Sequence, residues 1–158
     1  MDLQKAFDLV VHRILLSKLS IYLNSSNSLS FFCSYLKNTV QLVFIRGCYS
    51  SEGIVKYGVP QGSVLGPVLF CIYINDQPLH IPSDSAECHI LADDTTLHTT
   101  EKSVVQIQLT LQLCLDNISV WCNVNHMLIK PVKTKSMIIT TRQKHQLSDL
   151  SLRLSLDG

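Results

Sequence analysis

The feature that most constrains this chain is a ten-residue segment, residues 58–67, with the sequence GVPQGSVLGP. It holds three of the six glycines and two of the five prolines in the 158 residues. Glycine permits backbone conformations that are closed to other residues, and proline fixes φ. We therefore expect a tight backbone path here, followed by a helix that begins near Ser63 as its N-cap and ends at about Asn75. The backbone amides of such a turn can cradle a phosphate, although an ordinary strand-to-helix turn is the simpler interpretation of this segment alone.

Helices and short strands alternate irregularly along the rest of the sequence. Apolar spacing predicts helices over 12–23, 31–36 and 104–121, with a Ser/Asn-rich break over 24–30. Strand-like runs predict three hairpins: 40–46 with 53–59 around a loose loop, 87–92 with 95–100 around Asp93 and Asp94, and a basic pair over 127–129 and 136–140. This mixture favours an α+β architecture with an antiparallel sheet.

Charge is distributed unevenly along the chain. Apolar residues make up 46% and charged residues 16%, so one domain, or a piece of one, can form a core. A formal net charge of +1 argues mildly against a complete nucleic-acid enzyme. However, residues 117–148 carry five basic side chains and no acid, whereas the first 116 carry seven basic and ten acidic ones. The basic segment is interpreted either as a solvated edge or as a binding surface.

The six cysteines are expected to be reduced and mostly buried. The sequence has no Cys-x-x-Cys, and Cys122 with His126 has no partners at zinc spacing. The amino terminus has no apolar signal stretch, and the longest apolar run, 64–74, is too short to cross a bilayer. We therefore expect no membrane span and a nuclear or cytoplasmic location.

Two acidic segments are candidates for metal chemistry. Adjacent side chains on a strand face opposite ways, so Asp93 and Asp94 can serve one site only at a turn. With a third carboxylate, they could hold two hard divalent cations. Asp2 and Asp8 add two more carboxylates ahead of a helix. Taken alone, each segment is better explained by chance, by helix-start preference or by a frayed terminus.

In combination and in this order, four segments resemble the reverse transcriptases of non-LTR (LINE-type) retrotransposons. They are DLQKAFD at 2–8 with His12, GVPQGSVLGP at 58–67, LADDT at 91–95, and KTK at 133–135 followed by Met137. The second is the most specific, because ten consecutive residues fit. The resemblance extends from Asp2 to about Thr141. It implies a partial reverse transcriptase (palm) domain over 1–141 and a C-terminal extension toward a thumb over 142–158.

The resemblance implies an RNA-directed DNA polymerase with a palm of antiparallel sheet and packed helices, its fingers and thumb outside this sequence. Its partners would be an RNA template, a DNA primer and deoxynucleoside triphosphates, with no membrane. Asp2 and Asp93 would be the principal ligands of two Mg²⁺ ions, for which Mn²⁺ is the alternative. The Leu3 carbonyl would help, and Asp94 would complete the acidic cluster.

Four further residues acquire roles by the same resemblance. Phe7 would pack under the sugar of the incoming nucleotide and reject a 2′-hydroxyl. Gln61 and Gly62 would lie beside the incoming nucleotide and the template base. Lys133 would protonate or neutralise pyrophosphate, which gives the basic segment a purpose.

The sequence also departs from the family pattern. Leu91 stands in place of an aromatic residue, Lys130 in place of an asparagine, and Val11 in place of an acidic residue. The chain begins one residue before Asp2, so we expect little or no polymerase activity from these residues alone. The alternative is a non-enzymatic remnant that binds nucleic acid or protein through the basic C-terminal segment. A metal-dependent nuclease ranks last, because it leaves residues 58–67 unexplained.

Overall fold

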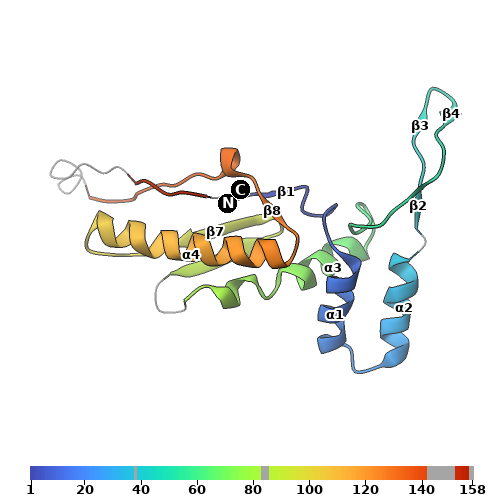
Figure 1. Cartoon of the computed structure of the whole chain (residues 1–158), viewed down its shortest axis with the longest axis horizontal. Helices are drawn as coiled ribbons and strands as arrows, with labels where there is room; N and C mark the ends of the chain where they lie inside the picture. The colour runs from blue at the N-terminus through green and yellow to red at the C-terminus, as the bar shows by residue number, and fades with distance from the viewer. Residues whose placement is uncertain (38, 83–85, 142–151, 157–158) are drawn as a thin grey trace. The chain divides into compact units, whose positions relative to one another are not determined.

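A computed structural model describes residues 1–37, 39–82, 86–141 and 152–156, which contain both helices and short antiparallel strands. The composition of elements agrees with the expected α+β class. The chain divides into two compact units (Figure 1). One comprises Lys5–Asn75, and the other comprises Met1–Gln4 together with Asp76–Gly158. We describe each unit by itself.

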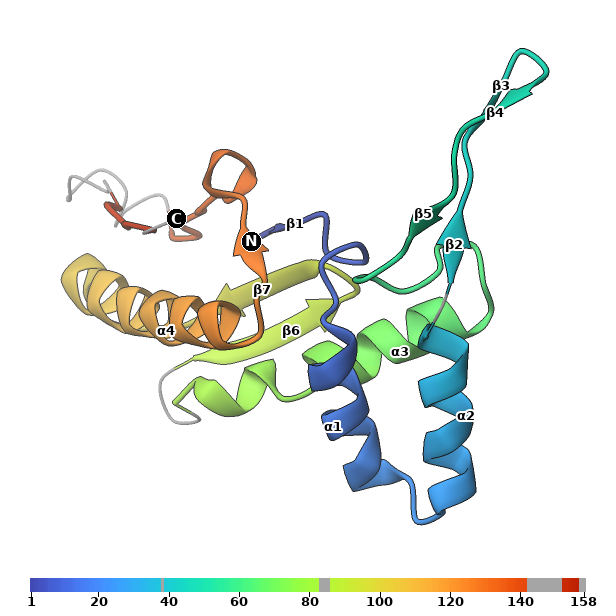
Figure 2. The same ribbon diagram turned by 45° about the vertical axis from the view of Figure 1, so that its right-hand side comes forward.

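Three helices form the core of the Lys5–Asn75 unit. Helix α1 (His12–Tyr22) packs against both α2 (Ser26–Leu36) and α3 (Leu65–Ile74), as Figure 2 shows. The fully buried side chains that join them are Leu15, Leu19, Leu36, Leu69, Phe70 and Tyr73. The expected helix at 31–36 was placed too late, because α2 already begins at Ser26. Serine and asparagine are tolerated in a first helical turn, so the polar run belongs to the helix rather than to the break.

An antiparallel arm extends away from these helices (Figure 2). Strand β2 (Val40–Gln41) pairs with β5 (Gly53–Ile54), and β3 (Phe44–Ile45) pairs with β4 (Cys48–Tyr49). The expected pairing is confirmed, but the loose loop at 47–52 is wrong. Arg46 and Gly47 have φ of 51° and 84°, which closes a tight two-residue turn and lets β4 begin at once. Residues 55–59 are not a strand.

The second unit contains a small antiparallel sheet. Strands β6 (Glu87–Leu91) and β7 (Asp94–His98) form a hairpin, and β1 (Leu3–Gln4) pairs with β8 (Leu128–Ile129). A bridge between Asp2 and Asp94 joins the two pairs. The resulting order is β6-β7-β1-β8, with β1 in the interior of the sheet.

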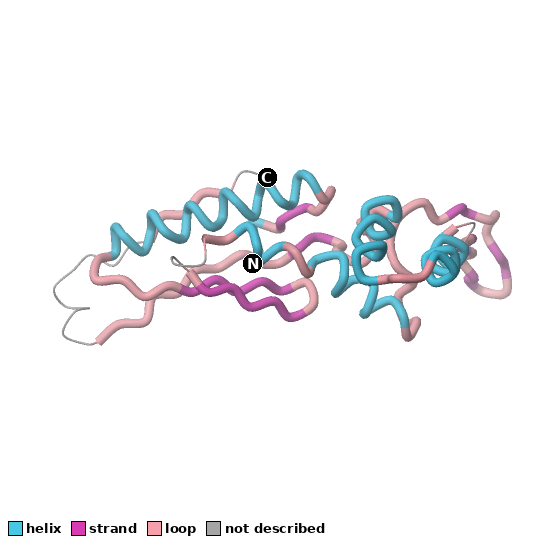
Figure 3. Tube along the Cα trace, turned by 90° about the horizontal axis from the view of Figure 1, so that it is seen from below, coloured by secondary structure: helices cyan, strands magenta, loops and turns pink. Residues whose placement is uncertain are grey.

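The long helix α4 (Val104–Val124) lies along the β6–β7 hairpin (Figure 3). Ser103 caps it by accepting a hydrogen bond from the Gln106 amide (3.2 Å). Its buried residues face the 3₁₀ turn η1 (Gln77–His80), β7 and β8. Trp121 is 2% exposed and donates its Nε1–H to Asp76 Oδ1 at 3.2 Å. This helix therefore supplies the hydrophobic support of the sheet.

The second, basic hairpin is a wrong prediction. Leu128–Ile129 pairs with β1 instead, and residues 134–141 form no strand. Pro131 has no amide hydrogen to donate and opens the 3₁₀ turn η2 (Pro131–Lys133), which turns the chain away from a hairpin. The turn of the β6–β7 hairpin also shifts by one residue: it consists of Ala92 and Asp93, and Asp94 already belongs to β7.

Among the described residues, no helix is both long and apolar enough to cross a membrane. The six cysteines are free, but the expectation that most of them are buried is wrong: Cys114 and Cys122 are buried, Cys33 and Cys88 are half-buried, and Cys48 and Cys71 are exposed.

Burial should separate the reactivity of these thiols. It raises the pKa of the Cys122 thiol to about 12. Since the thiolate is the nucleophile, alkylation of the native chain by iodoacetamide at pH 8 should be about 10³-fold slower at Cys122 than at the exposed Cys48. Peptide mapping of a labelling time course measures both rates. Equal rates in the native chain would contradict the buried position of Cys122, and equal rates in urea serve as the control.

Candidate active site

The sheet fixes Asp2 between two neighbouring strands. The amide of Thr95 donates to the Met1 carbonyl (2.9 Å), and the amide of Lys130 donates to the Asp2 carbonyl (2.9 Å). Asp2 therefore has β7 on one side and the residue after β8 on the other. Leu3, the next residue, is 3% exposed. Because successive side chains of a strand alternate between faces, the Asp2 carboxylate lies on the face opposite to the buried Leu3 side chain.

Asp94 lies directly opposite Asp2 in the bridge between the strands. Cross-strand partners have Cβ atoms about 5 Å apart, on the same face of the sheet. Their carboxylates are thus neighbours on the open face. Asp93 is half-buried in the adjacent turn. Ala92, the other turn residue, has φ of 53°, a backbone conformation that residues other than glycine rarely adopt. The structure thus pairs Asp2 with Asp94, whereas Asp93, expected to be a principal ligand together with Asp2, lies next to Asp94 in the turn.

A cation already approaches this carboxylate pair. Lys133 Nζ lies 3.2 Å from Asp2 Oδ2, with Asp2 17% exposed at its side chain and Lys133 61% exposed. Two like charges on neighbouring strands repel each other, and a nearby ammonium offsets that repulsion. Lys133 reaches Asp2 because η2 follows β8 directly. The β1–β8 pairing brings Asp2 and Lys133 together, although they are 131 residues apart in the sequence.

The donor set fits a hard divalent cation. Asp2, Asp93 and Asp94 offer only carboxylate oxygens, which are the ligands that Mg²⁺ prefers. The Asp2 carboxylate is mostly shielded from water, yet Asp94 is exposed, so a cation can approach from the open face. The role of the Leu3 carbonyl as a further ligand remains a prediction.

In the Lys5–Asn75 unit, the glycine-rich turn packs against the residues before α1. The Gly58 amide donates to the Val10 carbonyl (2.8 Å), and the Val59 amide donates to the Phe7 carbonyl (2.9 Å). Gly58 has φ of +89°, and a Cβ there would lie 3.0 Å from the Phe7 carbonyl oxygen. Only glycine allows both this conformation and this approach. The first and second sequence motifs are therefore in contact.

The start of α3 depends on the same turn. Ser63 Oγ accepts from the Gly66 amide (2.9 Å) and donates to the Pro60 carbonyl (2.7 Å). A Cβ on Gly66 would lie 2.5 Å from the Pro60 oxygen. The expected N-cap is one residue too early: Val64 precedes the first helical residue, Leu65, although Ser63 Oγ does accept the hydrogen bond from the Gly66 amide in the first turn.

The candidate nucleotide-binding residues lie around this contact. Phe7 stacks on Phe70 of α3, with ring centroids 4.3 Å apart and planes at 27°. Gln61 donates its Nε2–H to Asp8 Oδ1 at 2.7 Å. Gly62 has φ of +82° and open space around its Cα. These three residues belong to one unit, and Asp2, Leu3, Asp93, Asp94 and Lys133 belong to the other.

Two residues have site contacts that the sequence reasoning did not assign. Asp8 orients Gln61 through its carboxylate, and His12 Nε2 lies 2.7 Å from the Gly58 carbonyl oxygen. Both residues occur in the first motif, so their place in the motif could have indicated a role in the site. Their long-range partners, Gly58 and Gln61, could not be predicted from sequence spacing.

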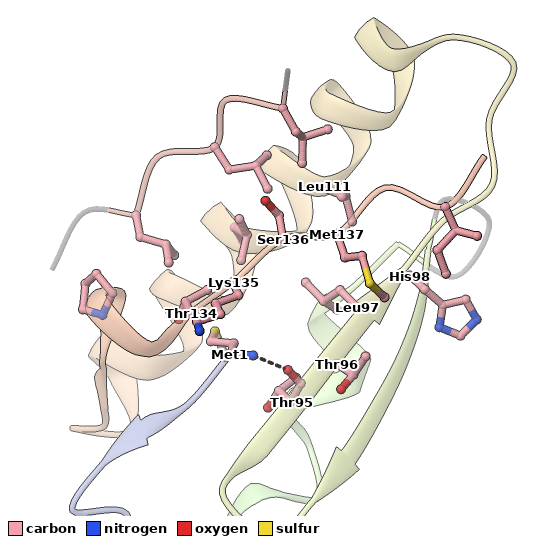
Figure 4. A pocket seen from close by; sticks show the side chains of 16 residues that line it. Met1, Thr95, Thr96, Leu97, His98, Leu111, Thr134, Lys135, Ser136 and Met137 are labelled. Carbon is pink, nitrogen blue, oxygen red and sulfur yellow. Dashed lines mark hydrogen bonds between the residues drawn. The ribbon is translucent and has the colours of Figure 1, made fainter. Parts of the chain in front are cut away.

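Each unit also has a cavity. A polar cavity of about 760 Å³ is lined by Asp8, His12, Tyr57 and Gln61, among others. The second, of about 560 Å³, lies between β7, α4 and the segment after η2 (Figure 4). Met1, Thr95, Leu111 and Met137 line it, and its lining includes none of the candidate carboxylates.

The C-terminal predictions are only partly covered by the described chain. Arg142 and Lys144 of the basic segment lie outside the described residues, as does most of the extension proposed for 142–158. Of the other basic residues, Lys133 forms the ion pair with Asp2, and Lys135 is exposed.

Comparison with known proteins gives consistent results over nearly the whole chain. The family model described as "Reverse transcriptase (RNA-dependent DNA polymerase)" matches residues 1–153. The "Probable RNA-directed DNA polymerase from transposon BS" of Drosophila melanogaster is 31% identical over 162 residues, which cover 99% of this chain and 17% of the relative.

Two further relatives are described as "RNA-directed DNA polymerase from mobile element jockey". The Drosophila melanogaster protein is 33% identical over 153 residues, covering 90% of this chain and 16% of the relative. The Drosophila funebris protein is 36% identical over 126 residues, covering 77% of this chain and 14% of the relative. The chain thus spans about a sixth of the length of these relatives.

Proposed function

Because the chain belongs to the reverse transcriptase (RNA-dependent DNA polymerase) family, we propose that it forms the catalytic palm of an RNA-directed DNA polymerase. The match to this family and the similarity to polymerases of mobile elements confirm the resemblance to reverse transcriptases of non-LTR retrotransposons. The observation that carries the proposal is the pairing of Asp2 with Asp94 in the sheet, beside the turn with Asp93. The palm would comprise residues 1–141, with 142–158 leading toward a thumb.

In this proposal Asp2, Asp93 and Asp94 would hold two Mg²⁺ ions, with the Leu3 carbonyl as a further ligand. When bound, such ions activate a primer 3′-hydroxyl and neutralise the charge that develops on departing pyrophosphate. The sheet contributes by holding the Asp2 and Asp94 backbones in register, so that the carboxylates need little rearrangement. The substrates would be deoxynucleoside triphosphates and a primer on an RNA template, in the nucleus or the cytoplasm.

Nucleotide selection would come from the glycine-rich contact. Phe70 supports the Phe7 ring from α3, so Phe7 can act as a fixed wall under the sugar and reject a 2′-hydroxyl. Asp8 orients Gln61, and Gly62 leaves room for a base to approach the backbone. These contacts support roles for Gln61 and Gly62 beside the incoming nucleotide and template base.

Lys133 would leave its resting partner during the reaction. Its partner Asp2 is one of the residues that would hold the metal ions, so the Lys133 ammonium would have to exchange this carboxylate for the pyrophosphate. The Lys133 side chain is 61% exposed, so its ammonium can move to another anion without leaving a buried position. Because Lys133 of the basic segment is paired with Asp2 of the same chain, it gives less support to the alternative in which this segment binds nucleic acid or protein without catalysis.

A substitution series tests this role of Lys133. It is measured in a chimaera in which residues 1–153 replace the matching segment of the jockey polymerase. Loss of a positioned proton donor typically lowers a rate by about 10²-fold or more, so Lys133→Ala should lower kcat of primer extension by about 10²-fold. Lys133→Arg keeps the charge but not a readily released proton, and should restore only part of the loss.

Lys102→Ala is the matched control, because Lys102 is an exposed lysine of the same unit that lies outside the four motifs. Its substitution should leave kcat within about twofold, since it removes only a solvated charge. Equal kcat values for Lys133→Ala and Lys102→Ala would exclude the proposed role of Lys133.

A further inference from the structure

A cluster of metal-binding side chains lies on the β6–β7 hairpin, four residues along β7 from Asp94. Glu87, His89 and His98 each offer one ligand atom, and these three atoms lie within 4.8 Å of one another. Glu87 Oε2 is 3.1 Å from His98 Nε2 and 3.8 Å from His89 Nε2. The two imidazole nitrogens thus converge on one carboxylate oxygen.

The strand register explains this convergence. Glu87 pairs directly with His98 across the hairpin, and His89 is two residues along β6 from Glu87, on the same face. The two imidazoles are diagonal neighbours and stack with centroids 5.0 Å apart and planes at 6°. All three side chains are at least half exposed, so a cation can reach them without any opening of the core. Their placement depends only on the hairpin, which is the longest strand pair described.

We propose that Glu87, His89 and His98 form a binding site for Zn²⁺ that clamps β6 to β7. Two imidazoles and one carboxylate are a ligand set that zinc accepts, with a water molecule in the fourth position. Tetrahedral zinc with bonds of about 2.0–2.1 Å places its ligand atoms about 3.3 Å apart. The 3.1 and 3.8 Å separations are close to that value, and the two imidazole nitrogens lie within 4.8 Å of each other, so binding requires rotations of exposed side chains and no movement of the strands.

The chemistry separates this site from the carboxylates around Asp2. Imidazole nitrogen suits zinc and other late transition metals, whereas carboxylates alone suit Mg²⁺ and Mn²⁺. Because Glu87 and His89 come from β6 and His98 from β7, a bound ion links the two strands that carry the Ala92–Asp93 turn. The clamp would therefore stabilise the hairpin independently of polymerase function.

Isothermal titration of the 158-residue chain with ZnCl₂ tests the proposal. The exposed thiols Cys48 and Cys71 are first replaced by serine, since thiolates also bind zinc. With excess MgCl₂ present to occupy the carboxylates around Asp2, we expect one equivalent of Zn²⁺ to bind and to raise the melting temperature. His98→Gln and Glu87→Gln should each weaken binding by at least about tenfold, because each removes a direct ligand.

His80→Gln is the matched control: His80 is an exposed histidine of the same unit but lies outside the cluster. It should leave the affinity unchanged. Imidazole NMR signals provide a second measurement, in which those of His89 and His98 should shift together at one equivalent of zinc. The proposal is overturned if His98→Gln binds zinc as tightly as the parent, or if the His80 and His126 signals shift at the same zinc concentration.

Discussion

The double substitution Asp93→Asn/Asp94→Asn should lower primer extension by at least about 10³-fold in the chimaera that carries residues 1–153. Asparagine keeps the size of each side chain but removes the negative charge that a hard cation requires. A loss of several kcal/mol of transition-state stabilisation corresponds to a thousandfold or greater change in rate. The assay is extension of an oligo(dT) primer on poly(rA) with Mg²⁺.

Asp116→Asn is the matched control, since Asp116 is an exposed aspartate on α4, far along the chain from the turn. Its activity should equal that of the parent chimaera. Full activity in the doubly substituted chimaera would show that polymerisation does not use these carboxylates. The 158-residue chain assayed alone should extend the primer little or not at all, because among the described residues only Lys133 forms an ion pair with one of the three candidate carboxylates, and a triphosphate carries several negative charges.

Trp121→Ala should destabilise the chain by about 3–5 kcal/mol. Trp121 is the largest fully buried side chain of α4, and its removal leaves a cavity between the helix and η1. It also removes the donor to Asp76 Oδ1. A domain of this size has a total stability of about 5–15 kcal/mol, so the loss is a large fraction of the whole. Urea denaturation followed by far-ultraviolet circular dichroism measures it.

Two further variants show where the effect of Trp121 originates. Val120→Ala, at the exposed neighbour on α4, should change stability by less than about 0.5 kcal/mol. Trp121→Phe keeps an aromatic ring but loses the hydrogen bond, and should lie between the other two variants. A Trp121→Ala chain as stable as Val120→Ala would contradict the packing of α4 described above.

Local sequence signals predicted the long elements well. The apolar spacing of α1 and α4 gave their first residues correctly, and α4 extends only three residues past the expected end at Trp121. Ser63 and the two glycines around it placed the start of α3 within two residues. These signals work because helix periodicity and capping depend on residues only a few positions apart.

Strand pairing between distant segments was not predictable in the same way. Residues 128–129 resemble half of a hairpin, but their partners are Leu3 and Gln4, more than 120 residues earlier in the chain. A two-residue strand has too few side chains to specify a register by its own pattern. The tight turn at Arg46 was missed because a left-handed arginine gives no sequence signal comparable to Asn-Gly.

The same distinction applies to the candidate site. The four motifs supplied the candidate residues, and the Asp2–Asp94 bridge and the Asp2–Lys133 ion pair bring together residues from three of these motifs. The contacts of Asp8 with Gln61 and of His12 with Gly58 required the folded chain. The order of the motifs indicates which residues are candidates for the site, whereas the contacts that each residue makes depend on how the chain folds.

Divalent-cation binding to the 158-residue chain tests the central claim most directly, because it needs no nucleic acid and no further protein. Electron paramagnetic resonance of Mn²⁺ reports the free ion, and bound Mn²⁺ that excess Mg²⁺ displaces reports the carboxylate site. We expect saturable, Mg²⁺-displaceable binding in the parent and in Asp116→Asn, and its loss in Asp2→Asn and Asp94→Asn. Unchanged binding in both of the latter chains would contradict a metal site built on Asp2 and Asp94.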